Sequence, residues 1–478
     1  MIKSVKFENF RNLNQTYNFN NRLNVIIGKN NSGKTNVLEG IKIAFSIVTG
    51  DYCKIYKSDF KDSDDSNPII ISIELENDSI TSLKCFEEDG TQKCGFKVII
   101  RKTNSNRYAR EIYLINDGYL DMDVLRNDIN LPNLYMIPLM RIEDIFNAGL
   151  TTGIAKFIES EERYKKIKDE SKEKIKEELK DKIDEFKALC SKFNEEMDID
   201  LSDPKITDEK IFITNNPLGH GTNIGSGYKS IANILLNTLD KNFNIILIDE
   251  IENHLHPALI RTLIRELRNI ENTIIISTTH SSVVINEMLI GEIIDISGKN
   301  INGIGDKVII DRLNNFLTPG RNELMLGDNI IIVEGYTEEI LLKNYLRNNN
   351  NNWTVVNVDG VMFKPYILLS IYLNKRVIVI SDNDKSKNNG NRSDRFSRLL
   401  EFCNEKNIKV IEVENTLESD LYINGYMSTV NSLLKEDGDY KVAKDKKKTE
   451  IAQHLIEENI DLSEWHVIRE LEDEFNGN

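Results

Sequence analysis

One octapeptide near the start of the chain constrains the fold more than any other feature of these 478 residues. Residues 28–35 read Gly-Lys-Asn-Asn-Ser-Gly-Lys-Thr, which matches the phosphate-binding pattern G-x-x-x-x-G-K-[ST]. The apolar residues 23–27 before it are a predicted strand, and residues 36–44 after it are a predicted helix. A strand, a glycine-rich loop and a helix in this order predict an α/β fold.

The residue types of this loop indicate that it binds a nucleotide. Glycines let backbone N–H groups turn towards phosphate oxygens, and the N-terminus of the next helix adds positive potential. We expect Lys34 to reach the β- and γ-phosphates of ATP, and the Thr35 hydroxyl to bind Mg²⁺. The predicted ATP-binding residues of the loop are Gly28, Asn31, Ser32, Gly33, Lys34 and Thr35.

A site that hydrolyses ATP also needs carboxylates at the end of a buried strand. The apolar residues 244–248 lead directly into Asp249 and Glu250. We expect Asp249 to hold the Mg²⁺ side of the site. Glu250, one residue later, is the predicted catalytic base that polarises the attacking water.

Acidic residues also follow predicted strands in the C-terminal part of the chain. Residues 330–333, 377–380 and 410–413 are apolar runs, and the acids near their ends are Glu334, Glu338, Asp382, Asp384, Glu418 and Asp420. The carboxyl ends of parallel strands lie at one edge of a sheet, and alternation places Asp382 and Asp384 on the same side of an extended chain. Converging carboxylates repel one another unless cations lie between them, and oxygen ligands suit Mg²⁺ or Mn²⁺. Such ions can activate water for attack on a phosphodiester.

The composition is that of a globular protein, with 40% hydrophobic and 29% charged residues. The sequence has no run of 18 apolar residues, no signal-peptide core and no CxxC pair among five cysteines. We therefore expect a cytoplasmic protein without membrane contact. The net charge of −16 differs from the basic balance expected of a nucleic-acid binder. It does not exclude a local basic groove, and acidic metal ligands lower the sum.

Two changes in composition divide the chain. Residues 151–210 contain a Lys/Glu-rich run with apolar residues at helical spacing, which predicts a helical insertion or dimerisation segment. The second change lies near residues 312–328, after which predicted strands and helices alternate as in a parallel sheet. We expect an ATPase domain over residues 1–325 and a second α/β domain over residues 326–478.

The first domain resembles an ABC-type ATPase head of the SMC/RecF-like branch. The resemblance rests on the long gap between the two halves of the nucleotide site, the Phe10-Arg11-Asn12 phrase and the Ser-Thr-Thr-His-Ser-Ser setting of His280. It implies that His280 senses the γ-phosphate. The signature loop of such heads would be residues 225–230, which depart from the LSGGQ pattern. The resemblance implies that Ser226 contacts ATP bound to a second subunit, and hence a homodimer or higher homo-oligomer through the heads.

The second domain resembles a TOPRIM domain through the ordered set Glu-Gly, Asp-x-Asp and Leu-Glu-x-Asp-Leu. Fused behind an ABC-type head, it resembles the OLD (overcoming lysogenisation defect) family of ATP-dependent nucleases. The resemblance implies that the metal ligands are Glu334, Glu338, Asp382, Asp384 and Glu418. It also implies a catalytic lysine that steadies the phosphate, for which Lys448 in the basic run 446–448 has the best spacing. This run could also hold the DNA backbone.

The expected function is an ATP-regulated DNA endonuclease that uses Mg²⁺ or Mn²⁺. The resembled family includes nuclease subunits of anti-phage systems such as Gabija and effectors associated with retrons. It therefore suggests bacterial defence, with a helicase, a reverse transcriptase or an RNA as partner. The main alternative is an ATP-gated DNA clamp or repair scaffold of the SMC/RecF type that does not cut, against which the full acidic set argues. A primase or topoisomerase is disfavoured, because the sequence offers no topoisomerase tyrosine in a recognisable setting and no zinc-binding domain.

Overall fold

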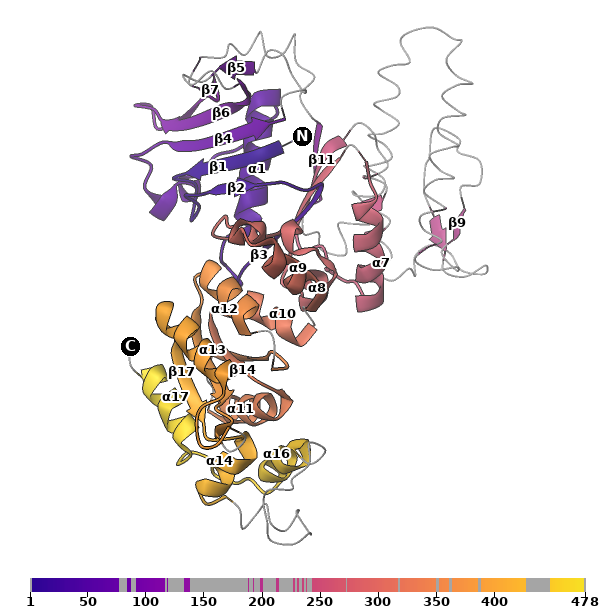
Figure 1. Ribbon diagram of the computed structural model, residues 1–478. Helices are drawn as coiled ribbons and strands as arrows, with labels where there is room; N and C mark the ends of the chain where they lie inside the picture. Colours follow the sequence, from indigo (N-terminus) through magenta and orange to yellow (C-terminus); the bar gives the residue numbers. More distant parts are fainter. Residues whose placement is uncertain are drawn as a thin grey trace. The chain divides into compact units, whose positions relative to one another are not determined.

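The computed structural model divides the chain into two compact units, Met1–Asn300 and Ile301–Asn478, whose elements are labelled in Figure 1. It describes residues 2–76, 84–86, 92–116, 118, 133–137, 198–200, 212–214, 243–271, 273–316, 319–349, 352–360, 363–385, 388–426 and 448–476, and single positions between 188 and 238. Within these residues, every helix is too short or too polar to cross a membrane.

The first unit contains an antiparallel sheet. Its strands are β1 (Ile2–Glu8), β2 (Thr16–Asn18), β4 (Ile69–Leu75), β5 (Lys84–Phe86), β6 (Gln92–Lys102) and β7 (Tyr108–Leu114). They pair in the order β2-β1-β4-β6-β5, and β7 also pairs with β6. Every second residue of β4 is buried, because one face of the sheet covers the core.

The same unit contains a parallel sheet with the order β13-β3-β12-β11-β8. Its strands are β3 (Leu23–Ile27), β8 (Asn133–Ile137), β11 (Phe243–Ile248), β12 (Ile274–Thr278) and β13 (Ile293–Asp295). All five residues of β3 and of β12 are buried, as is usual for parallel strands covered on both faces. Because β12 lies between β3 and β11, its carboxyl end lies between the two halves of the predicted nucleotide site.

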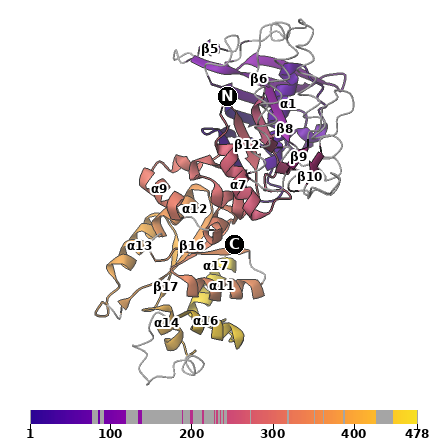
Figure 2. The ribbon, with the colours of Figure 1, turned by 90° about the vertical axis from the view of Figure 1, so that its right-hand side faces the viewer.

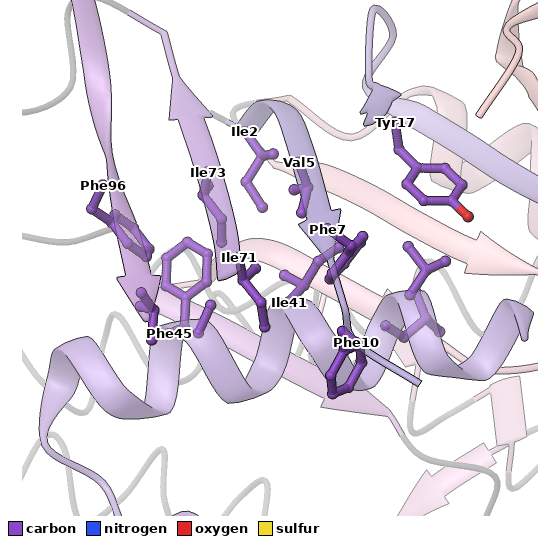
Figure 3. Close-up of a cluster of buried hydrophobic side chains, with 14 of the residues drawn as sticks. Ile2, Val5, Phe7, Phe10, Tyr17, Ile41, Phe45, Ile71, Ile73 and Phe96 are labelled. Atoms are coloured by element: carbon purple, nitrogen blue, oxygen red, sulfur yellow. The ribbon is translucent and has the colours of Figure 1, made fainter. Parts of the chain in front are cut away.

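Helix α1 (Lys34–Thr49) packs between these two sheets. Figure 3 shows Ile41 and Phe45 of α1 directed towards the antiparallel sheet, where Ile71 and Phe96 lie. The rings of Phe45 and Phe96 meet edge to face with their centroids 5.4 Å apart. Burying one such side chain contributes roughly 1.5–3 kcal/mol. The helix predicted after the glycine-rich loop is thus confirmed, and its core contacts fix the loop at its N-terminus.

Helices α7 (Pro257–Arg268) and α8 (Ser282–Glu287) complete the described part of the first unit, with a two-stranded antiparallel sheet of β9 (Asp198–Asp200) and β10 (Phe212–Thr214). The buried residues of α7, at positions 260, 263, 264 and 267, have the spacing of one helix face. Apart from β9 and positions 188 and 192, the predicted helical insertion at 151–210 lies outside the described residues.

As expected, the second unit is an α/β domain with a parallel sheet. Its strand order is β15-β14-β16-β17. Its strands are β14 (Asn329–Val333), β15 (Trp353–Asn357), β16 (Arg376–Asp382) and β17 (Lys409–Val413). Its helices are α9 (Lys307–Phe316), α10 (Pro319–Leu326), α11 (Tyr336–Asn348), α12 (Phe363–Tyr372), α13 (Asp394–Glu405), α14 (Leu417–Ile423), α16 (Lys448–Glu457) and α17 (His466–Asn476).

Helices cover both faces of this sheet. Alternate strand residues such as Ile331 and Ile378 join a core with α11, α14, α16 and α17, whereas α12 and α13 contact the strands from the other face. Figure 2 shows α13 and α17 on opposite sides of β16 and β17. The compact unit begins at Ile301, upstream of the domain boundary predicted at 325/326, because α9 packs against α12.

Candidate functional site

The glycine-rich loop between β3 and α1 is braced by a side chain from near the N-terminus. Gly33 precedes α1 with φ 102°, and a Cβ atom there would collide with the Asn12 amide. Asn12 Nδ2 donates to the Ser32 carbonyl at 2.6 Å, and Asn36 Nδ2 donates to Asn12 Oδ1 at 2.8 Å. The Phe10-Arg11-Asn12 phrase therefore has a local role, which is to hold the loop in shape.

Arg11 of the same phrase ties this region to a second loop. Its Nε and Nη2 donate to Asp59 Oδ1 at 3.0 and 2.9 Å, and its Nη1 donates to Asn36 Oδ1 at 2.7 Å. Asp59 is almost fully buried. A buried carboxylate needs such charge-assisted hydrogen bonds, so Arg11 fixes both segments at once.

Lys34 lies inside the loop with its ammonium group turned towards carbonyl oxygens. Its Nζ donates to the carbonyls of Gly28 at 2.9 Å and Lys29 at 2.6 Å. Burial lowers the pKa of Lys34, and the charges of Glu250 and Asp249 oppose that shift. The Ser32 hydroxyl is buried and has no hydrogen-bond partner among the described residues. A bound phosphate would supply acceptors to both groups, so the loop fits a nucleotide.

Asp249 connects the loop to the two strands beside it. The Thr35 hydroxyl donates to both Asp249 oxygens at 3.1 Å, and the fully buried Thr278 hydroxyl donates to Asp249 Oδ1 at 2.6 Å. Thr278 also accepts the backbone N–H of Glu250 at 2.8 Å. Sequence reasoning missed Thr278. Its signal was a pair of polar residues, Ser277 and Thr278, at the end of a strand that begins with three isoleucines.

Glu250 and His280 belong to the same site. Glu250 has a left-handed backbone with φ 50°. The carboxylate of Glu252 accepts hydrogen bonds from the backbone N–H of His280 and from the Thr279 hydroxyl, both at 2.7 Å. The pKa of His280 is lowered, first by burial and then by the charge of Lys34. The structure thus brings Lys34, Asp249, Glu250 and His280 together, with His280 neutral at pH 7.

The predicted signature loop is described in part. Ser226 and Gly225 lie outside the described residues, whereas Gly227 and Ser230 lie within them. A Cβ atom on Gly227 would fall 2.6 Å from the His254 carbonyl oxygen. Close packing against the segment that follows β11 therefore accounts for this glycine.

The candidate metal ligands of the second unit lie at the carboxyl edge of its sheet. Glu334 follows β14, Asp382 ends β16 with Asp384 two residues later, and Glu338 and Glu418 lie in the first turns of α11 and α14. Glu338, Asp382 and Glu418 are 9%, 7% and 5% exposed. Charged carboxylates at such depth need compensation by cations or hydrogen bonds.

Arg395 of α13 contacts the two other candidate ligands, Glu334 and Asp384. Its Nη2 lies 2.6 and 2.7 Å from the two carboxylate oxygens of Glu334 and 3.6 Å from Asp384 Oδ2. The Ser381 hydroxyl donates to Glu334 Oε2 at 3.1 Å. Sequence reasoning missed Arg395, which no local pattern distinguishes from other helix arginines. Asp384 does not continue the strand as expected from alternation, because β16 ends at Asp382 and Asp384 has a left-handed backbone with φ 51°.

The middle residue of the Asp-x-Asp motif holds this edge together. Asn383 is fully buried, and its Nδ2 donates to Glu412 Oε1 at 2.7 Å and Glu414 Oε2 at 2.9 Å. Its Oδ1 accepts the backbone N–H groups of Lys385 at 3.1 Å and Asn415 at 2.8 Å. Asn383 therefore fixes the loop after β16 to the loop after β17.

Asp420 anchors the C-terminal helix. It is 1% exposed and accepts hydrogen bonds from Trp465 Nε1, from the Glu414 backbone N–H at 2.9 Å and from His466 Nε2 at 2.9 Å. The pKa of His466 is raised, first by its hydrogen bond to Asp420. The lone pairs of Asp420 are thus engaged in packing α17 against α14.

The described residues contain no group of three acidic, cysteine or histidine side chains already arranged to hold a metal. The donor set nevertheless consists of carboxylates at one sheet edge, which is the chemistry that Mg²⁺ and Mn²⁺ prefer. The site fits a divalent cation if Glu334 and Asp384 turn away from Arg395. Lys448 begins α16, and its side chain lies outside the description.

Comparisons with known families agree with this geometry. Residues 1–130 and 141–285, more than half of the chain, match the family described as AAA ATPase domain. Residues 325–384 match the family described as overcoming lysogenization defect protein-like, TOPRIM domain. The second match contains Glu334, Glu338, Asp382 and Asp384 and ends before Glu418.

Individual relatives are distant. The chain is 23% identical over 419 residues to endonuclease GajA of Bacillus cereus (strain HuB5-5), covering 71% of this chain and 60% of that protein. It is similar to the solved SMC head bound to the C-winged helix domain of ScpA, with 15% identity, a TM-score of 0.46, and 63% and 95% of the two chains covered. The SMC head domain from Thermotoga maritima gives 13% identity, a TM-score of 0.36, and 62% and 94% coverage.

The chain spans about 60% of the length of GajA, the curated relative that it matches. The family matches and the two α/β units confirm the expected pairing of an ATPase domain with an OLD-like TOPRIM domain. The chain therefore belongs to the AAA ATPase domain family, carries an OLD-like TOPRIM domain after it, and is a distant homologue of the Gabija endonuclease GajA.

Proposed function

We propose that this chain is an ATP-regulated, divalent-metal-dependent DNA endonuclease. The observation that carries the proposal is the set of acids at one edge of the OLD-like TOPRIM sheet, of which Glu338, Asp382 and Glu418 are buried. Carboxylates gathered at one sheet edge are the oxygen ligands that Mg²⁺ and Mn²⁺ prefer. The distant relationship to an endonuclease supports the same reaction class.

In the ATPase unit, Lys34 and the loop around Ser32 bind the phosphates, and Thr35 with Asp249 holds Mg²⁺. Glu250 takes a proton from the attacking water. Its backbone N–H is held by Thr278, which sets the position of Glu250 relative to the nucleotide. His280, whose pKa is lowered, donates one ring N–H to an oxygen of the γ-phosphate.

In the TOPRIM unit, Glu334, Glu338, Asp382, Asp384 and Glu418 hold one or two Mg²⁺ or Mn²⁺ ions. A bound divalent cation supplies activation of water and neutralisation of charge at the phosphodiester. Lys448 steadies the scissile phosphate, and residues 446–448 contact the DNA backbone. Asn383 holds the loop after β16 and the loop after β17 together while the side chains of the ligands turn towards the metal.

The heads would pair so that Ser226 of one subunit contacts ATP bound to another, which makes the protein a homo-oligomer. The relationship to GajA and to the OLD family leads us to place the reaction in defence against phage. A helicase, a reverse transcriptase or an RNA is the class of partner that such a system would supply.

Cleavage of supercoiled plasmid by the purified protein tests the proposal. We expect nicked or linear product with Mg²⁺ or Mn²⁺, loss of product in Asp382→Ala, and a rate that ATP changes. In Lys34→Ala the cleavage site stays intact while the response to ATP disappears. Cleavage that survives both Asp382→Ala and Glu334→Ala would refute the site. ATP hydrolysis without cleavage under any condition would favour the non-cutting DNA clamp.

A further inference from the structure

The guanidinium of Arg395 contacts two candidate metal ligands that lie on different segments of the chain. Its Nη2 contacts both oxygens of Glu334 after β14, and Asp384 after β16 at 3.6 Å. Its Nη1 donates to the Gly360 carbonyl at 3.0 Å. The guanidinium therefore lies between two carboxylates that would otherwise repel each other.

The backbone around Arg395 holds the guanidinium in this position. Ser393 caps α13 by accepting the Phe396 backbone N–H at 3.2 Å, and its own N–H donates to the Asn383 carbonyl at 3.0 Å. The start of α13 is thus tied to the Asp-x-Asp loop itself. Gly360 has φ 71°, and a Cβ atom there would lie 3.4 Å from Arg395 Nη1. A glycine at this turn leaves room for the arginine.

Arg395 is the most exposed of the three side chains. It is 42% exposed, whereas Glu334 and Asp384 are 21% and 20% exposed. The guanidinium therefore borders solvent, and the two acids lie deeper at the sheet edge. A single guanidinium nitrogen, Nη2, contacts both oxygens of Glu334, and a charge-assisted hydrogen bond of this kind is stronger than an uncharged one.

We propose that Arg395 occupies the place of a divalent cation between Glu334 and Asp384, and that Mg²⁺ or Mn²⁺ must displace it to bind. The inference rests on the metal site of the proposed function. It adds that the metal concentration must be high enough for the ion to displace Arg395. When metal is scarce, Arg395 offsets the negative charges of Glu334 and Asp384. It lowers the apparent affinity of the acidic site for metal, because metal binding must first break the contacts of Arg395 with these two acids. Once displaced, the arginine remains at the rim of the site.

Metal affinity measured without DNA or ATP tests this competition. The full-length protein, freed of metal, is titrated with Mn²⁺ alone by calorimetry, and Mn²⁺-induced thermal stabilisation is a second readout. We expect Arg395→Gln to bind Mn²⁺ on the order of five-fold more tightly than wild type. Arg395→Lys keeps the positive charge but loses the planar guanidinium that reaches the two acids and the Gly360 carbonyl together, so it should give an intermediate affinity.

Arg392→Gln is the matched control. Arg392 lies three residues earlier and also pairs with a glutamate, but that partner, Glu412, is not a candidate ligand. The Mn²⁺ affinity of Arg392→Gln should equal that of wild type. Asp382→Ala identifies the binding heat as that of the acidic edge, because it removes a ligand.

Each result decides the inference. Unchanged or weaker Mn²⁺ binding in Arg395→Gln overturns it, and if Asp382→Ala still abolishes the binding heat, the metal site of the proposed function stands. Absence of binding in both wild type and Arg395→Gln overturns the inference and the metal site together. Binding in Arg395→Gln that wild type lacks in the same concentration range supports the competition.

Discussion

The two candidate sites solve opposite electrostatic problems. The nucleotide site is assembled before any ligand binds, since Lys34 hydrogen-bonds its own loop and Thr278 joins Asp249 to Glu250. At the acidic edge, Glu334 and Asp384 share a guanidinium from a neighbouring helix. An anion site can be built from backbone and lysine, whereas a cation site leaves surplus negative charge until its ion arrives. A site can therefore be fully assembled without its ligand only where the charges of its own groups already offset one another.

The largest expected effect tests whether the assembled site is catalytic. Glu250→Gln keeps the size of the side chain and removes the base, so ATP hydrolysis should fall by about 100-fold or more, equivalent to about 3 kcal/mol of barrier. ATP binding should persist, because Lys34 and the loop are untouched. Hydrolysis and nucleotide binding are measured separately, with Asp382→Ala as a control that retains hydrolysis. Near-normal turnover in Glu250→Gln would remove it as the base.

The next effect asks whether a buried acid beside the metal edge is structural. Asp420→Ala leaves Trp465 Nε1 and the Glu414 N–H without their acceptor, which should cost about 2–4 kcal/mol of unfolding free energy. Urea unfolding measures this cost. Asp420→Asn keeps an acceptor and should lose less. If Asp420→Ala unfolds like wild type, the anchor assigned to α17 is wrong.

A smaller effect is expected at the residue that connects the two strands of the nucleotide site. Thr278→Val preserves the shape but removes the hydroxyl, so the Glu250 N–H and Asp249 lose a partner at about 1–2 kcal/mol of stability. ATP hydrolysis should also slow, because Glu250 is no longer held. Thr278→Ser restores the hydroxyl and should recover both properties. Equal behaviour of the Val and Ser variants would contradict this role.

The smallest effect is a pH dependence in the second unit. Hydrogen bonding to Asp420 raises the pKa of His466 above its ordinary value of 6.5. Protonated His466 therefore stabilises the fold fully below about pH 6.5, and this contribution disappears as pH rises through the folded-state pKa. His466 is partly exposed, so the effect should stay below about 1 kcal/mol. His466→Gln should lower stability at pH 5.5 more than at pH 8.5, and equal losses would exclude the ion pair.

The local parts of both sites could be predicted from the sequence. The phosphate loop, the strand ending in Asp249 and Glu250, and the acids after β14 and β16 all follow from short patterns, since strand ends and glycine turns are set by neighbouring residues. The division at Ile301 was less accessible, because it depends on packing of α9 against α12 rather than on a composition change.

The sequence by itself determined the fold class, the nucleotide loop and the order of the acidic motifs, because each is encoded within a few consecutive residues. Only the tertiary structure decided that Thr278 meets Asp249 across 29 residues, Trp465 meets Asp420 across 45, and Arg395 meets Glu334 across 61. These partners are set by strand order and by helix packing. The physical reason is that a hydrogen bond depends on where two side chains arrive in space, and crossover connections in parallel sheets bring together residues that no local pattern relates.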